Sequence, residues 1–191
     1  MGRRLDCVAT RGRNGRVVVY DRVIATCRVN GRRVGDLTGS GKTTLANALL
    51  AESAFANDRV FLIEDTPELQ CSAWDLVATL TRRHPVPIGV VDLVRDALRM
   101  RPDRIVVGEM REGSAALETL KAWNTGHPGG LSTIHANSAR EALSRIEDLV
   151  AEVGVLVPRR VIVETIGVIA HIGRTRGGRR LDEVIYPQDL G

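Results

Sequence analysis

The feature that constrains this chain most is a glycine-rich turn that opens a helix predicted from Lys42 to about Ala51. Glycines in such a turn let backbone N–H groups point inward around an anion, and the N-terminus of the helix adds a favourable dipole. The Lys42 ammonium can reach the β- and γ-phosphates of a nucleotide, while the Thr43 hydroxyl can bind Mg²⁺. We interpret the whole turn as nucleotide-binding: Thr38, Gly39, Ser40, Gly41, Lys42, Thr43 and Thr44.

The turn departs from the pattern G-x-x-x-x-G-K-[ST] at its first position, where Asp36 stands in place of glycine and Leu37 follows. Residues 30–35 read NGRRVG, which is not the apolar strand that normally precedes such a loop. We therefore expect the first strand of the loop to be missing, which would leave neighbouring strands without a partner. A Gly-Ser linker that happens to precede a lysine is the alternative interpretation of the turn.

Length and composition fit one globular domain with a hydrophobic core, since the 191 residues are 43% hydrophobic and 26% charged. These values exclude a disordered tail, a collagen and a small disulfide scaffold. No apolar run approaches the ~18 residues of a membrane span, and the first residues do not form a signal peptide. Cys7, Cys27 and Cys71 lack C-x-x-C spacing, so we expect free thiols in a cytoplasmic protein.

The net charge of +4 is concentrated near the N-terminus. Residues 1–37 hold nine Arg and three Asp, whereas residues 38–191 hold eighteen basic and twenty acidic side chains. We interpret residues 1–37 as an atypical Arg/Gly-rich leader and residues 38–191 as the folded domain. The chain has only six aromatic residues, and single-strand binding relies on aromatic stacking, which argues against direct nucleic-acid binding. A basic nucleic-acid-binding module that uses the leader stays open as an alternative.

Short apolar strands alternate with helical stripes, which predicts a mainly parallel α/β sheet with helices on both faces. The expected strands are residues 16–20, 23–27, 60–63, 105–107 and 131–134. The expected helices include residues 42–51, 93–98, 116–120 and 143–150, followed by one that starts near Pro158. A C-terminal hairpin is expected from residues 168–173 and 181–186. Ligands of such sheets bind off the carboxyl ends of the strands.

Three of these strands end in residues that can carry chemistry. Glu109 follows strand 105–107 and occupies the place of a Walker B acid, which orients or deprotonates an attacking water. Glu64, Asp65 and Glu68 form an acidic cluster suited to holding Mg²⁺ through water. His135 ends strand 131–134 and is our candidate for a γ-phosphate sensor. The alternatives are a solvated loop acid, an acidic turn and a structural histidine.

Several arginines lie between or beside these acids: Arg82, Arg83, Arg99, Arg101, Arg104 and Arg111. A guanidinium stabilises the transition-state charge of phosphoryl transfer. We select Arg82, Arg99 and Arg101 as the first arginines to test for a role across a subunit boundary, because they sit between the acidic cluster and the strand before Glu109. Of these, Arg99 and Arg101 are our candidate catalytic residues. Taken singly, each arginine is also compatible with an ordinary surface ion pair.

Four motifs follow one another in the order TGSGKTTLANALL, VFLIEDTPELQC, DALRMRPDRIVVGEMRE and LKAWNTGHPGGLSTIHANSAREALSRIEDLV. Through them, residues 38 to about 190 resemble the type II/IV secretion and conjugation traffic ATPases, in particular the TrbB-type conjugal-transfer ATPases. The resemblance implies a RecA-like P-loop domain with ATP and Mg²⁺ as cofactors. It also implies a homo-hexameric ring at the cytoplasmic face of the inner membrane, where it would meet components of a secretion channel.

The same resemblance assigns roles to individual residues. It makes Lys42 and Thr43 the Walker A lysine and Mg²⁺ ligand, and it places Glu64 and Glu68 in an Asp box beside the metal. It makes Glu109 the Walker B glutamate and His135 the histidine of the His box. The implied function is an ATP-hydrolysing motor of type IV secretion or conjugation.

The leader stands where members of this family carry a sizeable N-terminal domain. A truncated gene that begins out of frame, or a wrongly chosen start, would produce such a junction. Asp36 would place a carboxylate ~6 Å from a phosphate charge, at a cost of a few kcal/mol for an effective dielectric of about 20. We therefore expect the chain as it stands to be a poor ATPase, and a catalytically impaired remnant is the alternative to an active motor.

Overall fold

The computed structural model describes residues 9–11, 17–19, 23–27, 41–52, 55–127, 129–175 and 178–190. Its strands are β1 Ala9–Arg11, β2 Val17–Val19, β3 Val23–Cys27, β4 Arg59–Glu64, β5 Asp75–Leu80, β6 Arg104–Val107, β7 Leu131–His135, β8 Val168–Thr175 and β9 Gly178–Ile185. Its helices are α1 Lys42–Leu50, α2 Val90–Arg99, α3 Gly113–Asn124, α4 Ala139–Ala151, α5 Arg159–Thr165 and the 3-10 helix η2 Pro187–Leu190.

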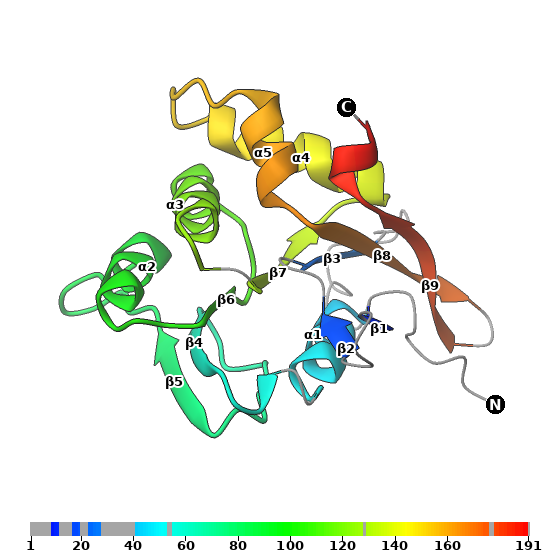
Figure 1. The fold of residues 1–191 in the computed structure, drawn as a ribbon. Coiled ribbons are helices and arrows are strands. Elements are labelled where there is room, and N and C mark those ends of the chain that lie inside the picture. The colour runs from blue at the N-terminus through cyan, green and yellow to red at the C-terminus, as the bar shows by residue number, and fades with distance from the viewer. Residues whose placement is uncertain are drawn as a thin grey trace.

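One seven-stranded sheet organises the molecule, in the order β5-β4-β6-β7-β3-β8-β9, while β1 and β2 form a separate antiparallel ribbon (Figure 1). All neighbouring strands of the large sheet are parallel except β8 and β9. The predicted parallel α/β fold with a C-terminal hairpin is therefore confirmed. The hairpin is longer than expected, and its register shifts between His171 and Ile172.

Helices cover both faces of this sheet, and side chains that alternate along each strand separate the two hydrophobic clusters. Phe61 and Ile63 of β4 pack in the cluster that includes α2, α3, α4 and α5. Val60 and Leu62 of the same strand pack in the cluster that includes α1. Figure 1 shows the corresponding arrangement, with α2 to α5 on one side of the sheet and α1 on the other.

Strand β3 takes a central place in the sheet, between β7 and β8. Val23 lies opposite Leu131 on one side and Val168 on the other. This corrects the expectation that the strand before the glycine-rich turn is missing. The strand lies further ahead of the turn than the usual pattern indicates, so sequence reasoning assigned it to the leader. The sheet thus includes residues from ahead of position 38, where the folded domain was expected to begin.

The other expected strands and helices are confirmed, but the short β1 and the edge strand β5 were missed. The run DLVATL of β5 forms an edge of the sheet and pairs only with β4 among the described strands. Leu76 and Leu80 are exposed on one face of this edge strand. The run carries apolar or small residues on both faces, so it lacks the alternation of apolar and polar residues that indicates a half-buried strand.

Two helices begin at residues that are typical of helix starts. The Ser138 hydroxyl accepts a hydrogen bond from the Glu141 N–H at 3.1 Å and so caps α4, while α5 begins directly after Pro158 as expected. In the described part of the chain, no helix combines the length and the apolar character needed to cross a membrane.

Backbone hydrogen bonds fix the segment after β6 between the ends of its two neighbours. Gly108 N–H donates to Ile63 O at 2.8 Å, and Met110 N–H donates to Thr133 O at 2.9 Å. Residue 109 is therefore held between β4 and β7. Since β4 ends at Glu64 and β7 ends at His135, the parallel sheet brings the predicted site residues to one edge.

Gly130, just before β7, packs closely against Trp123, and a substitution at this position tests that packing. The Trp123 indole is buried and donates from Nε1 to Ile105 O at 3.0 Å, and a Cβ at position 130 would lie 2.0 Å from that Nε1. We expect Gly130→Ala to lower the free energy of unfolding by about 1–3 kcal/mol in a denaturant titration. Gly89→Ala is the control, because its Cβ would meet only Asp92 Oδ2 at 3.8 Å. Equal stability of the two variants would contradict this account.

Candidate functional site

A cavity of about 550 Å³ opens at the carboxyl edge of the sheet, beside the N-terminus of α1. This volume lies within the range of small-molecule sites. The lining combines the start of α1, the carboxyl ends of β4, β6 and β7, and the start of β9. Its polar members are Lys42, Thr43, Thr44, Glu64, Asp65, Thr66, Glu68, Glu109, Arg111, Thr133, His135 and Arg179.

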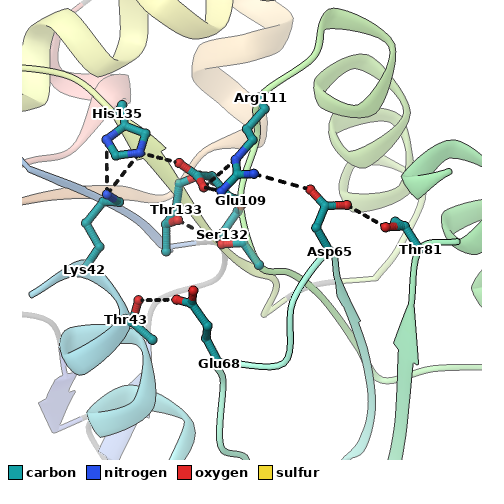
Figure 2. A network of polar contacts seen from close by, with 11 residues as sticks. Lys42, Thr43, Asp65, Glu68, Thr81, Glu109, Arg111, Ser132, Thr133 and His135 are labelled. Atoms are coloured by element: carbon teal, nitrogen blue, oxygen red, sulfur yellow. Dashed lines mark hydrogen bonds and ion pairs between the residues drawn. The ribbon is translucent and has the colours of Figure 1, made fainter. Parts of the chain in front are cut away.

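Lys42, His135 and Glu109 form a continuous chain of polar contacts across the cavity (Figure 2). Lys42 Nζ lies 3.2 Å from Nδ1 of His135, and Nε2 of His135 lies 2.7 Å from Oε1 of Glu109. An ammonium only donates hydrogen bonds, so Nδ1 accepts from Lys42 and Nε2–H donates to Glu109. The chain joins the first turn of α1 to the ends of β6 and β7.

The Glu109 carboxylate is held on both of its oxygens. Oε2 accepts from Arg111 Nε at 2.7 Å, while Oε1 faces His135. Burial alone would raise the pKa of Glu109, but the polar contacts with His135 and Arg111 outweigh burial and hold the pKa below its ordinary value of 4.5. Glu109 is therefore ionised at neutral pH and ready to accept a hydrogen bond or a proton.

Arg111 also reaches the loop after β4 (Figure 2). Its Nη1 lies 3.7 Å from Asp65 Oδ2, and Thr81 donates its hydroxyl hydrogen to Asp65 Oδ1 at 2.8 Å. The hydrogen bond that Arg111 donates to Glu109, with the charges of Glu109, Asp65 and Glu68, raises the pKa of Arg111, although partial burial opposes the shift. One guanidinium thus links the strand end that carries Glu109 to the acidic loop after β4.

The acidic loop is shaped by Glu64, the last residue of β4. Its side chain is 6% exposed, and Oε1 accepts from the N–H groups of Glu68 and Leu69 at 3.0 and 2.9 Å. These bonds turn the chain so that Glu68 faces α1, where the Thr43 hydroxyl donates to its Oε2 at 3.2 Å. Glu64 therefore positions the loop, while Thr43 and Glu68 present oxygen atoms to the cavity.

The charge of the lining suits a phosphate that arrives with a divalent cation. The carboxylates of Glu64, Asp65, Glu68 and Glu109 would repel phosphate oxygens unless a cation lay between them. The oxygens of Thr43 and Glu68 are the hard donors that Mg²⁺ prefers, and this ion takes one or two protein oxygens, phosphates and water. The donor set therefore fits Mg²⁺ bound together with a nucleotide.

Most of the predicted site residues meet in this cavity. Those that line it are Gly41, Lys42, Thr43, Thr44, Glu64, Glu68, Glu109 and His135. Thr38, Gly39 and Ser40 lie outside the described residues, as do Asp36 and Leu37. Arg99 ends α2 and Arg101 precedes β6, so both lie at the opposite end of the strands from the cavity. Their role across a subunit boundary stays a prediction.

Sequence reasoning left two charged lining residues, Arg111 and Arg179, out of the site. Arg111 was one of several arginines beside the acids, and its spacing could have selected it, since side chains two apart in an extended segment point the same way. Arg179 gave no such signal. It reaches the cavity from β9, and its proximity to Gly41 depends on how the C-terminal hairpin lies against α1.

Residues 33–174 match the family model described as "Type II/IV secretion system protein". Over 151 residues the chain is 50% identical to the conjugal transfer protein TrbB of Rhizobium radiobacter, a match that covers 78% of this chain and 46% of that protein. The chain therefore spans about half the length of the curated relatives it matches.

Two solved structures share the fold. The VirB11 ATPase of the Brucella suis type IV secretion system, in complex with sulphate, is 31% identical with a TM-score of 0.73, over 88% of this chain and 49% of that one. The pilus retraction motor PilT with bound ADP is 25% identical with a TM-score of 0.63, over 88% of this chain and 48% of that one. These likenesses bear out the predicted P-loop ATPase fold.

The pKa of Glu109 tests the role of Arg111. In Arg111→Ala the carboxylate loses a hydrogen bond and a positive charge, so its pKa should rise, as measured by a ¹³C NMR titration of the glutamate side chains. Arg95→Ala is the control, because Arg95 pairs with Glu118 on the helix surface and does not line the cavity. An unchanged Glu109 pKa in Arg111→Ala would show that this contact does not stabilise the carboxylate.

Proposed function

The chain belongs to the type II/IV secretion system protein family, and from this premise we propose that it is an ATP-binding and ATP-hydrolysing motor subunit of a type IV secretion or conjugative DNA-transfer apparatus. The main observation that supports the proposal is that one cavity brings together Lys42, His135 and Glu109. A cation at a helix N-terminus, opposite an ionised carboxylate at a strand end, is the arrangement that phosphoryl transfer to water requires.

Lys42 and the first turn of α1 bind the phosphates. The ammonium now contacts His135 Nδ1, and a phosphate oxygen would offer it a charged acceptor in place of a neutral one. The sulphate in the VirB11 structure and the ADP in the PilT structure support an anion and nucleotide site in relatives of this fold.

Thr43 and Glu68 would hold Mg²⁺ beside the phosphates, directly or through water. When bound, the ion neutralises phosphate charge and orients the terminal phosphate. Glu64 keeps this part of the site in shape, because its buried carboxylate holds the backbone of Glu68 and Leu69.

Glu109 orients the attacking water and accepts its proton. The low pKa keeps the carboxylate ionised but makes it a weak base, so orientation contributes more than proton abstraction before the transition state. His135 contacts both Lys42 and Glu109. When a terminal phosphate binds at Lys42, His135 therefore couples its presence to the position of the carboxylate that orients the water. Arg111 keeps its hydrogen bond to Glu109 while the phosphate binds and so holds the carboxylate in place.

The proposal extends to assembly and location. The chain acts in a homo-hexameric ring at the cytoplasmic face of the inner membrane, next to components of the secretion channel. Arg99 and Arg101 complete the site of a neighbouring subunit, since they lie apart from the cavity of their own chain. A catalytically impaired remnant is the second candidate, favoured by Asp36 at the first glycine position of the loop.

Substitutions at both ends of the polar chain separate binding from chemistry. We expect Glu109→Gln to lower ATP turnover by about 10²-fold or more while leaving the Kd of Mg·ATP nearly unchanged. Lys42→Ala should raise the Kd itself, because the ammonium contacts phosphate in the ground state. Glu118→Gln, at a surface ion pair, is the control. Nucleotide binding by the unchanged protein with no turnover would favour the remnant, and no binding at all would contradict the proposal.

Mixed rings test the arginines across the subunit boundary. Lys42→Ala and Arg101→Ala chains should each be poor ATPases, but their mixture should regain turnover, because some interfaces then combine an intact Lys42 with an intact Arg101 from the neighbour. Arg83→Ala replaces Arg101→Ala in the control mixture. If the mixture is no more active than the sum of its separate components, Arg101 does not act in trans.

A further inference from the structure

Arg179 is the second residue of β9 and lies against the start of α1. Its Cδ would be 2.5 Å, and its Nε 3.0 Å, from a Cβ built on Gly41, the residue just before Lys42. The same arginine lines the cavity together with Lys42, Thr43 and Thr44. The exposed side chain therefore forms part of the cavity wall beside the start of α1.

Two observations separate Arg179 from an ordinary surface arginine. Neighbouring side chains of a strand point to opposite faces, and Arg180 accordingly turns away from the cavity and pairs with Asp182 at 2.8 Å, with 71% of its side chain exposed. Gly41 has φ +101°, a conformation that favours glycine, and the Arg179 side chain occupies the space beside it.

The sheet order places the strand that carries Arg179 and the strands that precede Glu109 and His135 on opposite sides of β3. Glu109 and His135 come from the segments that follow β6 and β7, on one side of β3, whereas β8 and β9 lie on its other side. A phosphate chain that points its terminal group at Glu109 and His135 therefore directs its inner phosphates toward the hairpin. The hairpin side of β3 contributes Arg179 to the lining, whereas Glu64 and Glu109 come from the ends of β4 and β6 on the other side.

We propose that Arg179 is a nucleotide-binding residue that contacts the inner phosphates, the diphosphate group shared by ADP and ATP. This inference rests on the proposed nucleotide site. A guanidinium can donate two parallel hydrogen bonds to phosphate oxygens, which an ammonium cannot. Because ADP and ATP share this group, the contact stabilises the ground state and the transition state alike, and it sets affinity rather than turnover at saturation.

Calorimetric titration with Mg·ADP and Mg·ATP tests this assignment. Arg179→Ala should raise both Kd values by about tenfold or more, with kcat at saturating ATP nearly unchanged. Arg179→Lys should lose less affinity, since lysine keeps the positive charge but cannot donate the two parallel hydrogen bonds of a guanidinium. Arg180→Ala is the matched control and should bind as the unchanged protein does. If Arg179→Ala proves unstable, Arg179→Gln replaces it, because glutamine keeps most of the aliphatic part of the side chain over Gly41. Arg179→Gln should show the same loss of nucleotide affinity.

Each result is decisive for one part of the account. If the unchanged protein binds neither nucleotide, the proposed function fails before Arg179 is tested. If the unchanged protein binds and Arg179→Ala and Arg179→Gln bind equally tightly, the assignment of Arg179 is overturned. A lower kcat with unchanged Kd values would also overturn it, because Arg179 would then act on the transition state instead of the inner phosphates.

Discussion

The parallel arrangement of β4, β6 and β7 is the constraint on which the site depends. Parallel neighbours end at the same edge, so side chains that follow each strand meet although the chain between them is long. Glu64, Glu109 and His135 converge in this way, and Gly108 and Met110 hold the middle segment to its neighbours through backbone hydrogen bonds. Any change that shifts β6 relative to β4 or β7 would misplace Glu109.

Charge compensation organises the side chains at this edge. Lys42, His135 and Glu109 form one polar chain, and Arg111 connects its carboxylate end to Asp65. A buried or half-buried carboxylate stays ionised only when such partners outweigh the cost of desolvation. At Glu109 the partners do outweigh this cost, so its pKa is lowered. The proposed reaction uses the same contacts, because a phosphate competes with His135 for Lys42 while Arg111 stays on Glu109.

Sequence patterns predicted those parts of the molecule that local chemistry determines. The helix at Lys42, the strands before Glu109 and His135, and the gathering of these residues follow from periodicity and from the rule for parallel sheets. The strand Val23–Cys27 was expected, but its place inside the sheet between β7 and β8 was not, because it lies further ahead of the glycine-rich turn than the usual pattern indicates. The patterns also missed β5, whose apolar residues face both ways, and Arg179, whose approach to Gly41 depends on tertiary packing.

The central claim is that the terminal phosphate binds at the polar contacts that join Lys42, His135 and Glu109. A crystal structure with Mg²⁺ and a non-hydrolysable ATP analogue tests this claim most directly. The account predicts that this phosphate lies between Lys42 and His135, that Lys42 Nζ contacts its oxygens, and that Arg111 still holds Glu109. An analogue bound elsewhere, or bound here with the 3.2 Å contact between Lys42 and His135 unchanged and no phosphate against Lys42, would contradict it.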